Sequence, residues 1–195
     1  MSLAAARPSR ARSACLALLL VALTAAAPTA LATAFAALDL DERLERAVDV
    51  FVGDVSEVRF ERRGDLPWTV VTFRVTEWVL VDGSPSELGP LERSLAFLGG
   101  SAAGTAPRQV AGFPDVAVGE RYLVASYGPE AIGASPLVGV TQGLWREEAD
   151  AWRDAFGDAL GVDATGRPRL SDAGDPEGVW LPALRERVIE LRGTP

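Results

Sequence analysis

Short runs of alternating apolar and polar residues, separated by glycine and proline, constrain the fold of this chain more than any other feature. The clearest run covers residues 68–81, where Val71, Phe73 and Val75 alternate with polar side chains. A period of two predicts a strand with one buried face. Further runs at 48–58, 93–98, 121–127 and 137–144 predict additional strands. Gly53 breaks the alternation in the first of these runs, which predicts a β-bulge.

Apolar residues at helical spacing lie on both sides of this strand-rich region. They recur every three or four positions across 39–48, 145–160 and 181–191, which is typical of amphipathic helices. The middle stripe consists of Trp145, Ala149, Trp152, Phe156 and Leu160. The sequence therefore predicts a mainly β fold, a small antiparallel OB-like barrel with a short N-terminal helix and C-terminal helices over about 145–195. The predicted core contains Val50, Val52, Val71, Phe73, Val75, Phe97, Tyr122 and Val124.

The first part of the chain has the order of a secretory signal peptide. Its basic residues, Arg7, Arg10 and Arg12, precede an apolar run over 14–27. The rival interpretation is an uncleaved membrane anchor, because 13–38 carries no charge and is long enough to span a bilayer. Proline and threonine dilute the later part of that stretch, and we therefore favour the signal.

Overlapping A-x-A sites follow the apolar run. We expect cleavage between Ala36 and Ala37, with cleavage after Ala32 as the alternative. Residues 1–36 are then the signal peptide, and 37–195 form a single domain that is secreted or periplasmic.

The predicted mature domain has no cysteine and a strongly negative charge. The sole cysteine, Cys15, lies within the apolar run, so stability must come from an apolar core rather than from disulfides. All 19 basic residues are arginine, and loss of the three in the signal leaves 16 against 27 acidic residues, a net charge of about −11. We therefore expect no binding to nucleic acid and no stable membrane insertion after signal removal.

The absence of histidine and lysine narrows the chemistry that the chain can perform. A chain with no histidine cannot use a Ser-His-Asp or Cys-His mechanism, and it lacks the commonest ligand of zinc and copper. Without lysine it can form neither a Schiff base nor a lysine-containing phosphate-binding loop. We therefore expect no cofactor.

Three segments resemble netrin-type modules, the OB-like barrels of tissue inhibitors of metalloproteinases and of uncharacterised bacterial secreted proteins. They are 47–55, 72–80 with the following Asp82 and Gly83, and 119–124. The resemblance covers roughly 44–143 and implies an extracytoplasmic binding role. In the inhibitors, a mature N-terminal cysteine binds the zinc of the protease. This domain has no such cysteine, so inhibition of metalloproteinases is not implied.

Several groups of residues could form a site, and each has a structural alternative. The glycine-rich loop 99–104 could cradle an anion, although a hairpin connection explains it better. Asp163, Asp172, Asp175 and Glu177 could bind Ca²⁺, although their spacing fits no EF-hand loop and a solvated acidic turn is the alternative. The aromatic rings of Trp145 and Trp152 could anchor a partner, but core packing explains them better.

The sequence favours a non-enzymatic binding or interaction module whose partner is a protein or another envelope component. One alternative is a hydrolase based on two carboxylates, which needs no histidine and predicts an acidic pair in a cleft with one raised pKa. The other is an envelope protein tethered by the uncleaved N-terminal segment. No catalytic residue is assigned.

Overall fold

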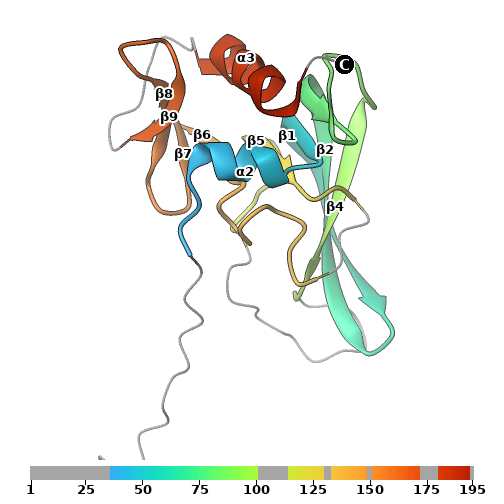
Figure 1. Ribbon diagram of the computed structural model, residues 1–195. Helices are drawn as coiled ribbons and strands as arrows, with labels where there is room; N and C mark the ends of the chain where they lie inside the picture. The colour runs from blue at the N-terminus through green and yellow to red at the C-terminus, as the bar shows by residue number, and fades with distance from the viewer. Residues whose placement is uncertain (1–35, 101–113, 130–132, 149–150, 172–179, 194–195) are drawn as a thin grey trace, which may run out of the picture. The chain divides into compact units, whose positions relative to one another are not determined.

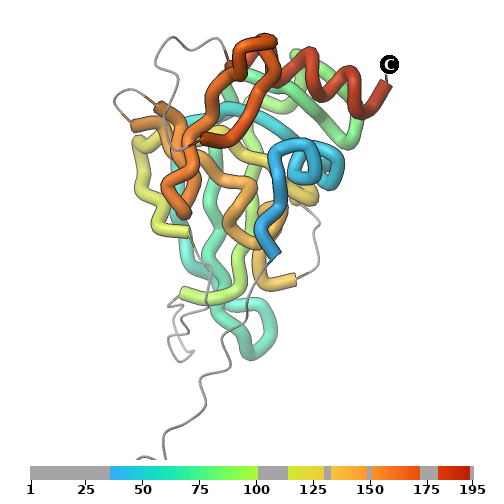
Figure 2. Tube along the Cα trace, turned by 60° about the vertical axis from the view of Figure 1, so that its left-hand side comes forward, coloured from blue at the N-terminus to red at the C-terminus, as the bar shows by residue number. Residues whose placement is uncertain are grey.

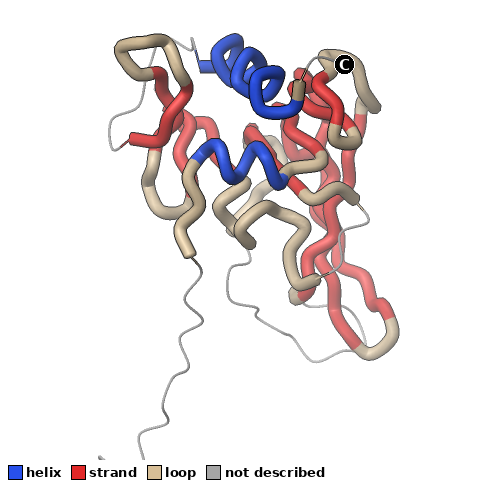
Figure 3. Tube along the Cα trace, viewed as in Figure 1, coloured by secondary structure: helices blue, strands red, loops and turns tan. Residues whose placement is uncertain are grey.

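The computed structural model describes residues 36–100, 114–129, 133–148, 151–171 and 180–193. They belong to one compact unit that begins at Ala36, in which two helices accompany an extensive sheet (Figures 1 and 3). The helices are α2 (Leu40–Arg46) and α3 (Trp180–Arg192). The strands are β1 (Asp49–Arg63), β2 (Leu66–Val81), β3 (Ser84–Pro85), β4 (Glu92–Leu98), β5 (Arg121–Ser126), β6 (Leu144–Glu148), β7 (Ala151–Asp154), β8 (Ala159–Val162) and β9 (Pro168–Ser171).

The strands form one antiparallel sheet, as the mainly β prediction requires. Their order is β3-β2-β1-β5-β6-β7-β8-β9, and β4 pairs with β2 beside β3. Within the described residues the path from β3 to β9 does not return to its start, so the sheet is not closed. The expected mainly β class is confirmed, whereas a closed OB-like barrel is not.

A long hairpin of β1 and β2 forms the centre of the sheet. Its register shifts between Val52 and Gly53, so the predicted irregularity at Gly53 is confirmed, but the additional residue at this shift is Thr76 on β2 and not a residue of β1. A Cβ atom at Gly53 would lie 3.0 Å from the carbonyl oxygen of Arg74, and the close approach of the two strands therefore favours glycine. The hairpin turns at Gly64, whose φ is 61°, and its tip extends away from both helices (Figures 1 and 2).

Both faces of the central strands are buried, each in its own apolar cluster. Val50 and Val52 on β1 pack in the cluster that contains α2 and α3, whereas Phe51 packs in the opposite cluster. On β5, Leu123 joins the helix side and Tyr122 the opposite side. This alternation follows from the period of two in a strand. All eight residues of the predicted core are buried.

The two helices predicted at the start and the end of the domain are present as α2 and α3. A capping box begins α2, because the amide of Glu42 donates to Asp39 Oδ1 (2.8 Å) and the amide of Asp39 donates to Glu42 Oε2 (3.2 Å). Arginines on α3 reach back to α2: Arg187 pairs with Asp41, and Arg192 donates to the main-chain oxygen of Leu44 (3.0 Å).

The predicted helix over 145–160 is wrong, because this segment contributes β6, β7 and the start of β8. Trp145 and Trp152 are both buried, as predicted, but on two paired strands of a hairpin. Phe156 lies in the next turn and is 67% exposed, so it does not continue a buried stripe.

The predicted strand over 137–144 is also wrong. Residues 137–143 form turns, apart from an isolated bridge between Ser126 and Leu137, and β6 begins only at Leu144. Gly139 with φ 61° and Val140 with φ 71° place two successive residues in the left-handed region, which interrupts an extended strand.

Candidate functional site

A surface cavity of about 280 Å³ lies where β5, β6 and β7 pair. Its lining combines apolar and charged side chains: Pro114, Asp115, Tyr122, Thr141, Leu144, Arg146, Glu148, Arg153, Asp154 and Ala155. A concave site of this mixed character is the kind of surface on which small molecules bind.

The strand register places three of the lining side chains in one row. Tyr122 on β5 pairs with Arg146 on β6, and Arg146 pairs with Arg153 on β7. Residues directly opposite one another in antiparallel strands carry their side chains on the same face. The sheet therefore brings a phenol and two guanidinium groups to the cavity, although they are distant in sequence.

Tyr122 forms the inner part of this row. Its ring is buried, and its hydroxyl donates to the carboxylate of Glu120. Burial raises the pKa of Tyr122, and the hydrogen bond to Glu120 and the charge of Glu120 raise that pKa further. The phenol therefore stays protonated at neutral pH and acts as a hydrogen-bond donor rather than as a base.

Ion pairs balance most of the charge around the cavity. Arg146 lies 2.9 Å from Glu148 and 3.7 Å from Glu120, and Arg153 lies 3.8 Å from Glu148. The hydrogen bond from Arg146 to Glu148 raises the pKa of Arg146. These pairs are partly exposed and contribute little to stability, but they neutralise two arginines and two glutamates.

Asp115 also lines the cavity, but it takes part in none of these ion pairs. Its main-chain oxygen lies 3.3 Å from the hydroxyl of Tyr122, while its exposed carboxylate has no ion pair with any residue that the structure describes. The negative charge of Asp115 lies close enough to the phenol to help raise the pKa of Tyr122. Among the described residues, the cavity therefore carries one negative charge without an ion-pair partner, close to the hydroxyl of Tyr122.

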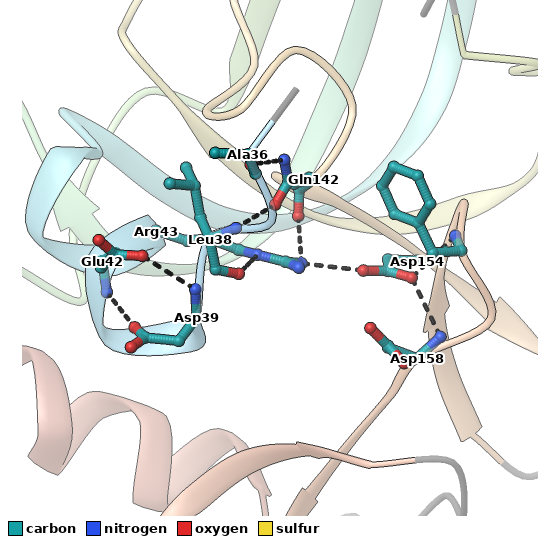
Figure 4. A network of polar contacts seen from close by, with 9 residues as sticks. Ala36, Leu38, Asp39, Glu42, Arg43, Gln142, Asp154 and Asp158 are labelled. Carbon is teal, nitrogen blue, oxygen red and sulfur yellow. Dashed lines mark hydrogen bonds and ion pairs between the residues drawn. The ribbon is translucent and has the colours of Figure 1, made fainter. Parts of the chain in front are cut away.

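A buried polar network lies behind the cavity and is centred on Arg43 (Figure 4). Its guanidinium group lies 2.9 Å from Asp154 Oδ2 and donates to the main-chain oxygens of Gln142 (2.7 Å) and Leu38 (3.0 Å). The guanidinium also stacks over the ring of Trp145, 5.4 Å from its centroid. Because Asp154 also lines the cavity, the network fixes one wall of the site.

Asp154 has partners for both of its carboxylate oxygens. While Oδ2 accepts from Arg43, Oδ1 accepts from the main-chain amides of Phe156 (2.9 Å) and Asp158 (3.1 Å). The side chains of Arg43 and Asp154 are 3% and 0% exposed. A buried pair of this kind is tolerated because hydrogen bonds satisfy the remaining polar atoms.

The residues that the sequence singled out for calcium binding do not form a described cluster. Asp163 lies in the turn between β8 and β9, and its Oδ1 accepts from the amides of Thr165 (2.7 Å) and Arg167 (3.1 Å). Hydrogen bonds from Thr165 lower the pKa of Asp163. Its predicted partners, Asp172, Asp175 and Glu177, lie outside the described residues. Within the described part of the chain, no group of three or more acidic residues could hold a metal ion.

The other predicted sites have structural roles where they are described. Gly99 donates its amide to the main-chain oxygen of Pro67 (2.9 Å) and accepts from Thr69 Oγ1 (2.9 Å), so it connects the end of β4 to the hairpin. Residues 101–104 of that loop lie outside the described residues. Trp152 packs edge-on against Trp180, with ring centroids 5.1 Å apart, and therefore fixes α3 to the sheet.

Two features of the site could not be recognised in the sequence. The row of Tyr122, Arg146 and Arg153 depends on pairing of the correctly predicted strand β5 with β6 and β7, which the sequence predicted as a helix. The Arg43–Asp154 pair joins residues that are 111 positions apart. The sequence offers one signal for this pair: Arg43 lies on the apolar side of the opening helix, where its side chain is buried.

A second exposed surface lies in the loop between β3 and β4. Leu88 and Leu91 are 85% and 80% exposed. Trp78 holds this loop in place, because its Nε1 donates to the main-chain oxygen of Pro90 (3.0 Å) and its ring leaves no room for a side chain at Gly89. Two leucines on a fixed loop form an apolar contact surface.

Comparison of the chain with family models, with curated proteins and with solved structures finds no match. None of the described helices is long and apolar enough to cross a membrane.

Proposed function

We propose that the chain is exported and that its domain is a non-enzymatic binding module whose cavity holds a small ligand with a positively charged nitrogen. The observation that supports this most strongly is the carboxylate of Asp115 near Tyr122, which has no ion pair with any described residue, in a cavity whose other charges are paired. A ligand cation gains from the charge of Asp115.

The ion pairs of the arginines favour a cationic ligand over an anionic one. An anionic ligand would have to displace Glu148 or Glu120 from Arg146, which already lies 2.9 Å and 3.7 Å from them. A cation disturbs neither pair. The apolar side chains of Leu144 and Pro114 in the lining suit a short hydrocarbon attached to the charged nitrogen.

The carboxylate-based hydrolase is less well supported. Among the described residues, the buried carboxyl whose pKa is raised is that of Asp49, and desolvation is the main cause. Asp49 accepts hydrogen bonds from Arg93 and from the amide of Asp82, and it does not line the cavity. An acid with a raised pKa at the cavity is what that mechanism requires, and Asp49 lies elsewhere.

The proposal also includes an N-terminal export signal and a relationship of the domain to netrin-type modules. The basic n-region and apolar run support export, and the mainly β sheet is compatible with a netrin-type module. The alternative of a tethered envelope protein is tested by the intact mass of the exported protein, since retention of residues 1–36 is the expected result for tethering.

The ligand class is tested by NMR titration of the domain with butylammonium, using butyrate and butanol as matched probes. We expect shifts at Tyr122 and Leu144 with butylammonium alone. Asp115→Asn is expected to weaken that binding about threefold to fivefold, the value of one partly exposed ion pair. Asp65→Asn makes the same charge change at the exposed β1–β2 turn and serves as the control. Equal binding of butyrate, or equal weakening by both variants, contradicts the proposal.

A further inference from the structure

The side chain of Gln142 binds the main chain at the start of the domain. Its Nε2 donates to the main-chain oxygen of Ala36 (2.9 Å), and its Oε1 accepts from the amide of Leu38 (2.7 Å). Figure 4 shows the side-chain amide facing this segment from the turn that precedes β6. One amide group thus satisfies both main-chain groups that flank Ala37, as a neighbouring strand would.

Gln142 is held firmly in this position. It is 2% exposed, and its main-chain oxygen accepts from Arg43 Nη1 (2.7 Å). Its side chain fills the space above Gly139, where a Cβ atom would lie 3.0 Å from Gln142 Cβ. The N-terminal segment is equally well anchored after Ala37, because Leu38 and Leu40 are buried in the helix-side cluster.

Cleavage between Ala36 and Ala37 would remove half of this interaction. The Nε2 group of Gln142 would lose its acceptor, and the amide nitrogen of Ala37 would become an ammonium group near that unpaired donor. The hydrogen bond is part-buried, and loss of the acceptor there destabilises the folded state. Cleavage farther upstream leaves both hydrogen bonds intact.

We propose that the signal is removed upstream of Ala36, at the A-x-A site ending at Ala34 or at Ala32, so that Ala36 stays with the domain and Gln142 clamps the mature N-terminus. This inference rests on the proposed export. It replaces the site that the sequence alone favours, after Ala36, because the folded domain uses the carbonyl group of that residue.

The first test is N-terminal sequencing and intact-mass analysis of the exported protein, after expression of the full chain in a bacterium. A mature chain that starts at Phe35 or Thr33 is expected. A start at Ala37, or an exported chain that keeps the whole segment, overturns the inference. A chain that remains in the cytoplasm contradicts the export proposal itself and removes the processing step with it.

The second test measures the clamp independently of export. Domains that start at Phe35 and at Ala37 are released from a cleavable fusion, and their melting temperatures are compared. We expect the chain from Ala37 to melt about 2–4 °C lower, the shift that follows loss of one hydrogen bond in a domain of this size. Equal melting temperatures contradict the clamp, and this comparison needs no substitution.

Gln142→Met is the matched control for the second test. Methionine has a similar length but can neither donate to Ala36 nor accept from Leu38. In this background the difference between the two chain lengths is expected to disappear. A difference that persists shows that Ala36 stabilises the domain through another contact, and the role of Gln142 is then refuted.

Discussion

Replacement of Arg43 by methionine is expected to destabilise the domain strongly. The substitution removes the charge that faces Asp154 at 2.9 Å and the donors to the main-chain oxygens of Gln142 and Leu38. Asp154 keeps two amide partners on Oδ1, but Oδ2 is left buried and unpaired. Removal of one partner of a buried ion pair costs about 3–5 kcal/mol. We therefore expect the urea midpoint to fall by more than about 1 M at an unchanged slope.

Arg46→Met is the control for this measurement. Arg46 lies on the same helix and pairs with Glu42 at 3.5 Å, but both side chains are about half exposed. Its loss is expected to cost no more than about 0.5 kcal/mol. If Arg43→Met destabilises the domain no more than Arg46→Met, the buried network does not organise this wall of the cavity, and the reasoning from burial is refuted.

Two further substitutions test the turn before β6 and the contact between the helices. In Gly143→Ala the new Cβ atom would lie 2.2 Å from the main-chain oxygen of Ala125. We therefore expect the free energy of unfolding, measured by urea denaturation, to fall by about 1–3 kcal/mol. Unchanged stability would show that the turn adjusts freely. Arg187→Gln tests the pH dependence of stability. The hydrogen bond from Arg187 lowers the pKa of Asp41 below its usual 3.8. The stabilisation by this pair is therefore present above about pH 4 and is lost as the pH falls through the lowered pKa. The stability difference between wild type and Arg187→Gln is therefore expected to shrink toward about pH 2, and a difference that is independent of pH would contradict this.

The strands with clear alternation could be predicted because local pattern and burial agree. The register shift at Gly53 shows this, since a single glycine marked one of the positions at which the paired strands change register. The opening and closing helices were predicted for the same reason, because their apolar residues recur at helical spacing and pack in the helix-side cluster.

The segment around Trp145 and Trp152 could not be predicted from spacing alone. Two buried residues seven positions apart fit one face of a helix, but they also fit the two arms of a hairpin. A turn signal was present in residues 154–157, where Asp154 accepts from the amide of Phe156 and Gly157 has φ 91°. The candidate site was hidden by the same error, because Arg146 and Arg153 approach each other only after these strands pair.

The position of a bound cation tests the central proposal most directly. In isotope-labelled domain saturated with butylammonium, intermolecular nuclear Overhauser effects between the ligand methylenes and protein side chains identify the binding surface. We predict contacts to the ring of Tyr122 and the methyl groups of Leu144. Contacts to Leu88 and Leu91 instead, or no contacts at saturating ligand, would contradict binding in this cavity.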